Sequence, residues 1–313
     1  MKTNKKIFSF CLITDKKYLA QTTILLDQLK DYNVYILCID TESYNFILKN
    51  YHNNCEILKL DTLEKFFNLK KIKYNRSYLE YIFTLKSFFI KWIFKKIKKN
   101  YYVIYLDSDI LFFSEPALLI RDINTHSVCL TPHSFSKNNC HFNIYGKFNA
   151  GFISFKNDKY GLKVLNFWAK SCEKECSYTN IQNFADQMYL NILYKNFCKV
   201  KQINNAGVNL APWNLDSFKI NINKKNQILV DGKRVVFFHF HGFKNIFGII
   251  YSLGLKEYKV KKNKKIINYI YKKYLNLLNK KIQNYKELKS YHYNYNLIKL
   301  IKNSIKCNLL INI

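Results

Sequence analysis

Residues 101–109 read Tyr-Tyr-Val-Ile-Tyr-Leu-Asp-Ser-Asp, an apolar run that ends in two acids. The unbroken run predicts a strand that is buried on both faces of a sheet. Because residues i and i+2 of an extended chain point the same way, Asp107 and Asp109 would aim their carboxylates at one point. Two adjacent negative charges are unfavourable unless a cation lies between them, and hard oxygen ligands suit Mn²⁺ or Mg²⁺. The pair indicates a metal site, with a polar turn that caps the strand as the alternative.

Strand and helix patterns alternate on the N-terminal side of this run. Buried strands are expected at 7–13, 34–39 and 55–60, and helices at 18–30 and 77–98. This alternation predicts an α/β fold, with a Rossmann-like, mostly parallel central sheet and helices on both faces. Ligands of such sheets bind at the carboxyl ends of the strands. Besides Asp107, those ends carry Thr14, Asp15, Asp40 and Asp61.

The C-terminal half is less regular. We expect a strand at 148–155, helices at 162–170 and 185–196, and a hairpin with arms at 228–230 and 234–238. Glycine and proline are absent after Gly254, where the bias towards Lys, Asn, Ile, Tyr and Leu deepens. The composition divides the chain into a main domain, residues 1–254, and a basic amphipathic helical C-terminal extension, residues 255–313.

The chain of 313 residues is strongly basic, with 51 Lys and Arg against 21 Asp and Glu and a net charge of +30. Such a charge indicates an anionic partner: nucleic acid, nucleotide phosphates or acidic lipid. The codon usage of an AT-rich genome is the alternative source, since Lys, Asn, Ile, Tyr and Phe are all abundant. An apolar fraction of 49% excludes intrinsic disorder as the main state.

Cysteine usage and apolar runs indicate the compartment. Nine Cys form no complete zinc-binding pattern, which predicts reduced thiols and a cytoplasmic location. The apolar run at 7–13 is too short for a signal peptide and has no cleavage site after it. No uncharged apolar stretch of 18 residues is present, so no membrane span is expected.

Two further motifs carry side chains that suit sugars. Asn149 precedes Ala150 and Gly151, whose small size permits close approach of a ligand to the backbone. Asp186 and Gln187 open the helix expected at 185–196 and offer a carboxylate and an amide to sugar hydroxyls. Each motif alone also has an ordinary explanation: a turn into a strand, or a favourable helix N-terminal carboxylate.

A histidine motif follows the hairpin: His239-Phe240-His241-Gly242-Phe243-Lys244. A neutral imidazole suits a metal that is already held by two carboxylates, so one of the two histidines, His239 or His241, could be a third ligand. Lys244 lies just past a flexible glycine and could meet phosphate. A histidine satisfied within the core is the alternative.

Together the motifs resemble those of GT-A glycosyltransferases in order and spacing: Leu106-Asp107-Ser108-Asp109, Phe148-Asn149-Ala150-Gly151, Ala185-Asp186-Gln187 and His239-x-x-Gly242. The chain looks most like the retaining branch similar to glycosyltransferase family eight and its bacterial nucleotide-diphospho-sugar transferase relatives. Stretches at 207–214 and 237–240 also resemble segments of bacterial members, and the likeness covers about residues 6–247. Unlike that family, the chain has no Pro-Trp pair after Lys244, which leaves the role of this lysine open.

The resemblance implies a GT-A catalytic domain at 1–254 and a set of roles. Asp107, Asp109 and His239 would hold Mn²⁺ or Mg²⁺. Asn149, Asp186 and Gln187 would face the transferred sugar as catalytic residues. The residues implied in binding the nucleotide-diphosphate sugar are Thr14, Asp15, Arg76, Thr84, Lys86, Ser108 and Lys244.

The implied activity is metal-dependent transfer of a sugar from a nucleotide-diphosphate donor, UDP-sugar by preference, to a glycan or lipid-linked glycan. Bacterial surface polysaccharide or lipooligosaccharide synthesis would use such a step. Retention of the anomeric configuration is favoured over inversion, because the sequence offers no clear carboxylate base for inversion.

Two other classes stay open. The charge of +30 fits a nucleic-acid-binding protein, but the chain has no helix-turn-helix, zinc-finger or aromatic RNA-platform signature, so no nucleic acid is expected. A sugar-nucleotide nucleotidyltransferase also uses paired Asp residues. That class normally needs a Gly-rich phosphate loop near the N-terminus, and residues 8–18 contain no glycine.

The extension at 255–313 is the most basic part, with a net charge of +13. Within it, apolar residues recur at helical spacing at Ile267, Ile270, Tyr274 and Leu277. The pattern predicts a helix that lies in the plane of an anionic membrane, on the inner face of the plasma membrane, where each basic residue contributes about 1 kcal/mol. The alternative is a helix that packs back on the catalytic domain.

Overall fold

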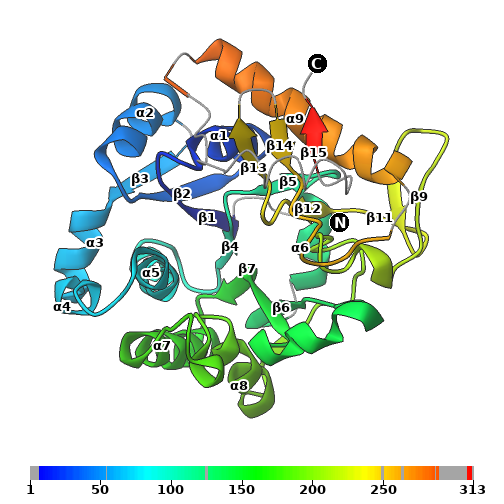
Figure 1. Ribbon diagram of the computed structural model, residues 1–313. Coiled ribbons are helices and arrows are strands. Elements are labelled where there is room, and N and C mark those ends of the chain that lie inside the picture. The colour runs from blue at the N-terminus through cyan, green and yellow to red at the C-terminus, as the bar shows by residue number, and fades with distance from the viewer. Residues whose placement is uncertain are drawn as a thin grey trace.

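The computed structural model describes residues 7–53, 55–123, 126–247, 250–261, 264–285, 287–288 and 309–311. Its centre is a seven-stranded sheet with the strand order β3-β2-β1-β4-β7-β6-β8 (Figure 1). The strands are β1 Phe8–Thr14, β2 Asn33–Cys38, β3 Cys55–Lys59, β4 Tyr102–Leu106, β6 Val128–Pro132, β7 Phe148–Lys156 and β8 Val200–Gln202. Among these described strands only β7 runs against its neighbours, which confirms the mostly parallel α/β sheet predicted from the sequence.

Helices cover both faces of the sheet, because alternate residues of each strand point to opposite sides. Phe10 and Leu12 of β1 join the core on one face, and Cys11 and Ile13 join the core on the other. The first face is covered by α1 Leu19–Gln28, α2 Thr41–Tyr51, α6 Ala117–Ile123 and α9 Lys264–Asn284 (Figure 1). The second is covered by α3 Leu60–Phe67, α4 Lys70–Lys73, α5 Tyr78–Phe94, α7 Lys159–Lys174 and α8 Met188–Asn196.

Two elements of the C-terminal half differ from expectation. Helix α8 begins at Met188 rather than at 185, because Ala185 has a left-handed backbone, with φ of 50°, and the next two residues form a turn. The second hairpin arm is divided between β11 (Lys233–Arg234), which pairs with β10 (Ile228–Val230), and β12 (Phe237–His239), which pairs with β5 (Ile110–Phe112). Strand β12 is buried and β11 is exposed, so the apolar segment enters the core while the charged segment stays at the surface.

Helix α9 packs against α1 and shares the core of the domain that precedes it (Figure 1). Ile267, Ile270 and Tyr274 are buried there and Leu277 is partly buried, so the stripe expected to face a membrane faces the protein. The in-plane membrane helix predicted for this stretch is therefore wrong, because helical periodicity does not reveal which apolar surface covers the stripe. Most of the extension after α9 lies outside the described residues. None of the described helices is long and apolar enough to cross a bilayer.

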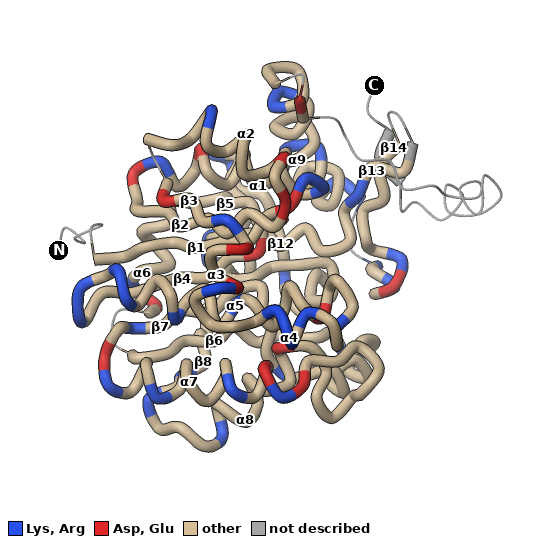
Figure 2. Tube along the Cα trace, turned by 90° about the vertical axis from the view of Figure 1, so that its left-hand side faces the viewer, with Lys and Arg blue, Asp and Glu red and all other residues tan. Residues whose placement is uncertain are grey.

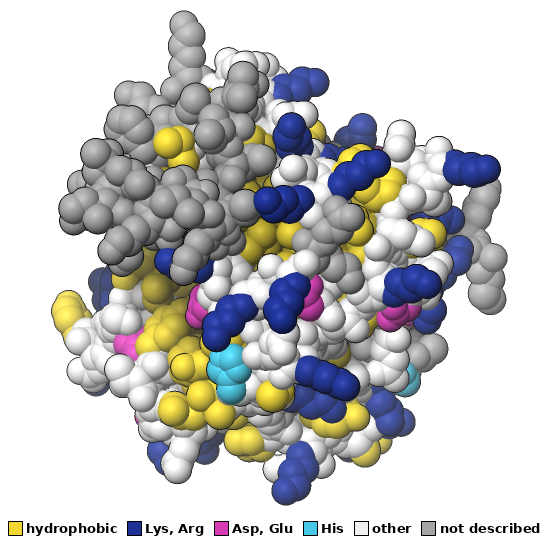
Figure 3. Space-filling model, turned by 45° about the vertical axis from the view of Figure 1, so that its right-hand side comes forward, with side chains coloured by type: hydrophobic (Ala, Val, Ile, Leu, Met, Phe, Trp, Pro, Cys, Tyr) yellow, Lys and Arg dark blue, Asp and Glu magenta, His cyan; other side chains and the backbone are white. Residues whose placement is uncertain are grey.

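The positive charge is dispersed. Lys and Arg occur on many separate segments of the described chain (Figure 2). On the face shown in Figure 3, they are scattered among apolar and uncharged side chains, and several lie beside Asp or Glu. A groove that tracks a nucleic-acid backbone needs a continuous basic stripe, and the described residues of this face form none.

Replacing Tyr274 with alanine should lower the free energy of unfolding by about 3–5 kcal/mol, because removal of a large buried ring leaves a cavity. Tyr274 is fully buried and stacks on Phe240, with ring centroids 3.9 Å apart. Its hydroxyl makes no hydrogen bond with the described residues, so Tyr274→Phe is a matched control that should cost less than about 1 kcal/mol. Urea unfolding of the full chain measures both. Equal midpoints for Tyr274→Ala and the natural chain would contradict the packing of α9.

Candidate functional site

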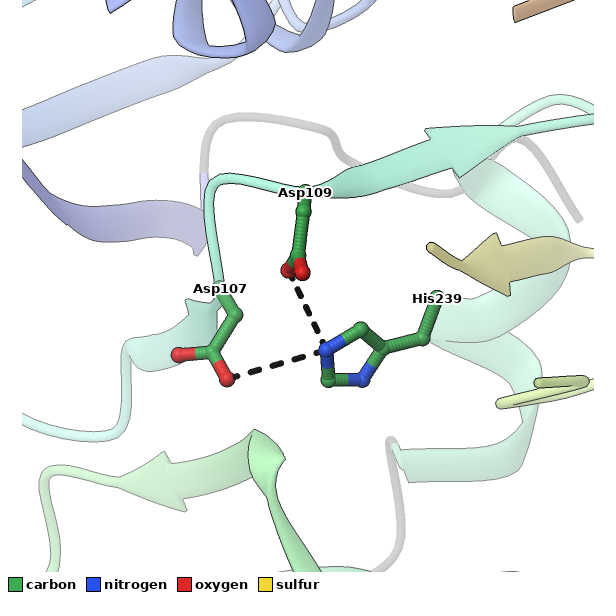
Figure 4. A group of neighbouring side chains, drawn as sticks. All are labelled: Asp107, Asp109 and His239. Atoms are coloured by element: carbon green, nitrogen blue, oxygen red, sulfur yellow. Dashed lines mark ion pairs between the residues drawn. The ribbon is translucent and has the colours of Figure 1, made fainter. Parts of the chain in front are cut away.

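Two acids and a histidine meet at the carboxyl end of β4. Asp107 follows β4, and Asp109 immediately precedes β5. Strand β12 pairs antiparallel with β5 and sets His239 opposite Ile110. As Figure 4 shows, the imidazole points at both carboxylates, with Nε2 at 3.1 Å from Asp109 Oδ1 and 3.9 Å from Asp107 Oδ2.

This triad fits a divalent cation. One ligand atom from each of Asp107, Asp109 and His239 lies within 4.8 Å of the others. Two carboxylate oxygens and one imidazole nitrogen are a donor set that suits Mn²⁺ and accepts Mg²⁺. Burial lowers the pKa of His239, but the Asp109 carboxylate raises it, and the net pKa lies above its ordinary value. The Asp107 side chain is 28% exposed, so the triad opens on that side towards a ligand.

Gly151 makes room for the histidine ring. A Cβ atom at this position would lie 2.5 Å from His239 Cε1 and 2.7 Å from Asn149 Oδ1. The backbone N–H of Gly151 donates to that same Asn149 oxygen at 3.1 Å, and its carbonyl accepts from the N–H of Asp107 at 2.9 Å. Gly151 of the Asn-Ala-Gly motif therefore makes space for the His239 ring.

A buried lysine ties the triad to the Asp-Gln motif. Lys86 of α5 is 3% exposed, and its Nζ lies 3.2 Å from Asp107 Oδ1 and 3.5 Å from Asp186 Oδ2. Burial lowers the pKa of Lys86, but the two carboxylates raise it to a net value above the ordinary one. Burial raises the pKa of Asp186 to about 6, although Lys86 opposes the rise. Lys86 thus lies between the two carboxylates and nearer to Asp107, while burial has the largest effect on the pKa of Asp186.

The triad lines a cavity of about 590 Å³ at the carboxyl ends of β1 and β4. Most of the residues predicted to form the site surround this one cavity, namely Thr14, Asp15, Lys86, Asp107, Ser108, Asp109, Asn149, Asp186, Gln187 and His239. Ser108 also donates a hydrogen bond to the Ile13 carbonyl at 2.7 Å, which joins the turn that carries Asp107 and Asp109 to the end of β1.

The family can be named from the sequence match over this region. A family model described as nucleotide-diphospho-sugar transferase matches residues 30–239, a range that contains the triad and the Asn-Ala-Gly and Ala-Asp-Gln motifs. The chain belongs to this family. The alternative of a nucleic-acid-binding protein is thereby set aside in favour of a sugar transferase.

Relatives of the transferase include two proteins of Bacillus subtilis (strain 168), YfnD and YfnF, both described as uncharacterized. YfnD is 28% identical over 247 residues, which cover 75% of this chain and 78% of YfnD. YfnF is 28% identical over 248 residues, which cover 75% of this chain and 82% of YfnF. Among solved structures, the apo-form glycosyltransferase GlyE of Streptococcus pneumoniae TIGR4 matches with a TM-score of 0.48 and 15% identity, over 94% of this chain and 66% of that chain.

Three residues expected to bind the donor lie away from the transferase cavity. Arg76 Nη2 donates to the carbonyls of Cys172 and Glu173, both at 3.2 Å, and so fastens the start of α5 to the end of α7. Thr84 is fully buried and donates to the Glu80 carbonyl at 2.9 Å. Lys244 lies in β13 (Lys244–Phe247) and lines a separate cavity of about 360 Å³.

Of the other acids that follow the strands, only Asp15 lines the cavity, whereas Asp40 and Asp61 lie elsewhere. Asp15 lines the transferase cavity and accepts a 2.6 Å hydrogen bond from the Tyr78 hydroxyl. Asp40 instead caps α2 by accepting from the N–H of Ser43 at 2.7 Å. Asp61 lies in the first turn of α3 and is exposed.

Several residues that line the cavity were not among the site residues predicted from the sequence. Tyr78, Trp213, Glu257 and Tyr258 all line the cavity. Trp213 belongs to the stretch 207–214 that resembles bacterial relatives, which is the one hint the sequence contains. The others come from a helix start and a loop, where no periodic pattern marks a ligand-facing side chain.

Proposed function

We propose that the transferase moves a sugar from a nucleoside-diphosphate donor, UDP-sugar, to a hydroxyl of a glycan or lipid-linked glycan. Mn²⁺, or Mg²⁺, would be held by Asp107, Asp109 and His239. The observation that carries this proposal is the convergence of these three side chains inside the 590 Å³ cavity. Bacterial surface polysaccharide synthesis is the role that the sequence resemblance implies.

The nucleoside is assigned to the end of the cavity beside β1. Strands β1 and β4 are neighbours in the sheet, yet the chain passes through β2 and β3 between them, so a crevice opens at their carboxyl ends. Thr14 and Asp15 lie at that point. The Asp15 side chain also accepts from the backbone N–H groups of Lys17 and Tyr18, at 2.9 and 3.1 Å, which holds the loop in place beneath the ligand.

The leaving group needs stabilisation, since cleavage of the anomeric C–O bond leaves negative charge on the nucleoside diphosphate. A bound divalent cation supplies that stabilisation as a Lewis acid. Lys86 donates a hydrogen bond to the Ala150 carbonyl at 3.2 Å and forms an ion pair with Asp107. Lys86 would therefore orient Asp107 as a metal ligand and neutralise part of the charge of its carboxylate. We therefore assign Lys86 a positioning role rather than direct contact with the donor.

The transferred sugar is assigned to Asn149, Asp186 and Gln187. Asp186 is buried, and its Oδ2 pairs with Lys86 Nζ at 3.5 Å but accepts no hydrogen bond from the described residues, so it can still accept one from a sugar hydroxyl. Gln187 uses its Nε2 to donate to the Tyr145 carbonyl at 2.8 Å, which leaves Oε1 as the atom for the sugar. Retention is proposed on the sequence grounds given above, and the anomeric configuration of the product, read by NMR, decides it.

A panel of nucleotide sugars tests the proposed reaction. The full chain is incubated with each donor and Mn²⁺, and the released nucleotide is identified by chromatography. We expect release of UDP from at least one UDP-sugar, by slow hydrolysis even without an acceptor, and loss of that release in EDTA. Release of pyrophosphate from a nucleoside triphosphate and a sugar phosphate would instead identify a nucleotidyltransferase. Release of UDP at the same rate in EDTA would overturn the metal assignment.

A further inference from the structure

Many aromatic rings line the cavity, and six of them form one group of mutual contacts that adjoins the triad. We call this group the aromatic wall, and it consists of His133, Phe135, Phe142, Tyr145, Trp213 and Tyr258. These residues come from the loop after β6, the 3₁₀ segment Lys137–Tyr145, and the loops that contain Trp213 and Tyr258.

The rings of the wall support one another. His133 stacks on Phe135, with centroids 4.7 Å apart and planes 11° apart. Phe142 lies 5.8 Å from Phe135 and 5.4 Å from Tyr258. Because each ring packs against its neighbours, the wall is a preformed surface, and a ligand that binds to it need not order it first.

The wall begins at the metal site. The Trp213 ring lies edge-to-face with His239 at a centroid distance of 5.1 Å. Trp213 is 2% exposed, and its Nε1–H makes no hydrogen bond with the described residues. A buried donor without a partner is unfavourable, so this N–H would gain from an oxygen acceptor supplied by a ligand. The exposed side chains of His241 and Glu257 line the same cavity, and the His241 ring lies 5.6 Å from the Trp213 ring.

We propose that the aromatic wall binds a pyranose ring of the acceptor glycan. The C–H groups on one face of a pyranose pack on aromatic rings, and the wall provides such rings. The hydroxyls around the pyranose form hydrogen bonds with polar groups, and Trp213 Nε1, His241 and Glu257 provide these. The position beside His239 brings an acceptor hydroxyl to the sugar end of the donor. This inference rests on the proposed function, because it takes the end of the cavity beside β1 as the nucleoside site.

A nucleobase can also stack on aromatic rings, so the test separates the two ligands. Methyl α- and β-pyranosides of glucose, galactose, mannose and N-acetylglucosamine serve as probes, because they carry no aromatic group of their own. Saturation-transfer difference NMR of the full chain with UDP and diamagnetic Mg²⁺ detects contact with the sugar ring protons. Calorimetry measures the Kd of UDP in the same samples.

Phe142→Ala removes the centre of the wall, and Phe167→Ala is the matched control, on α7 and in contact with Phe197 instead of the cavity. With the natural chain, at least one glycoside should show ring-proton signals. Phe142→Ala should weaken that signal by about fivefold or more and change the Kd of UDP by less than about twofold, whereas Phe167→Ala should change neither. If Phe142→Ala does not fold, Tyr145→Leu removes another ring of the wall and is held to the same expectation.

Two outcomes would overturn the proposal. One is a natural chain that binds UDP but shows no signal with any glycoside at 20 mM, which is about twentyfold above a Kd of about 1 mM. The other is a Phe142→Ala chain that loses UDP affinity and keeps its glycoside signal, since the wall would then hold the nucleobase. Failure of the proposed function is distinguishable, because the natural chain would then show no metal-dependent binding of UDP at all.

Discussion

Asp109→Asn is expected to lower the rate of sugar transfer by at least about 10²-fold, even in saturating donor and Mn²⁺. Asparagine keeps the size of the side chain but removes the charge that would hold the cation. The Asp109 side chain pairs with His239 at 3.1 Å and lines the cavity, so Asp109→Asn removes no packing from the apolar core and the variant should fold. Steady-state kinetics at several Mn²⁺ concentrations, with circular dichroism to verify folding, measure the effect.

Asp61→Asn is the matched control for this variant. Asp61 also follows a strand of the central sheet, but it is exposed and lies 3.9 Å from Lys65 on the surface of α3. We expect the transfer rate of Asp61→Asn to stay within about twofold of that of the natural chain, because an exposed ion pair contributes little to stability. Natural turnover by Asp109→Asn in the presence of EDTA would show that the acids do not act through a metal.

Gly151→Ala is expected to weaken Mn²⁺ binding by about 10–100-fold, although residue 151 contributes no ligand atom. The new methyl group would lie 2.5 Å from His239 Cε1, and a shift of the ring to relieve this contact would disturb its alignment with Asp107 and Asp109. Free Mn²⁺ is counted directly by its electron paramagnetic resonance signal. Transfer activity should fall in parallel.

A double-mutant cycle shows whether this loss passes through the histidine. If Gly151→Ala acts by displacing His239, the combination of Gly151→Ala with His239→Ala should bind Mn²⁺ no more weakly than His239→Ala alone. Additive losses in the double variant would mean that the methyl group disturbs the site by another route, such as the Asn149 oxygen 2.7 Å away.

The parts of the site that follow from local sequence were predictable. The carboxylates of Asp107 and Asp109 converge as their spacing predicts, and the alternation of strand and helix patterns identifies the parallel sheet whose carboxyl edge forms the cavity. His239 is distant in sequence, and it reaches the acids through the pairing of β12 with β5. Periodicity within either strand does not reveal that pairing, so the prediction of His239 depended on the resemblance.

Other side chains lie elsewhere than the sequence suggested, because each had more than one possible partner. Arg76 is a suitable phosphate ligand by type, but the fold brings the end of α7 to it, and backbone carbonyls occupy its guanidinium. Gly242 has a φ of 75°, and after this turn Lys244 lies in a strand beside another cavity. The apolar stripe of α9 could pack against a bilayer or against a protein core, and in the structure it packs against α1 within the core of the domain.

The central claim is that Asp107, Asp109 and His239 hold the divalent cation of a nucleotide-diphospho-sugar transferase. Electron–nuclear double resonance of Mn²⁺ bound to the full chain with UDP tests it most directly, because the spectrum reports a nitrogen nucleus bonded to the metal. We predict ¹⁴N coupling from one imidazole in the natural chain and its loss in His239→Gln, which replaces the ring with an oxygen donor. The same nitrogen coupling in both proteins, or no Mn²⁺ bound in the presence of UDP, would contradict it.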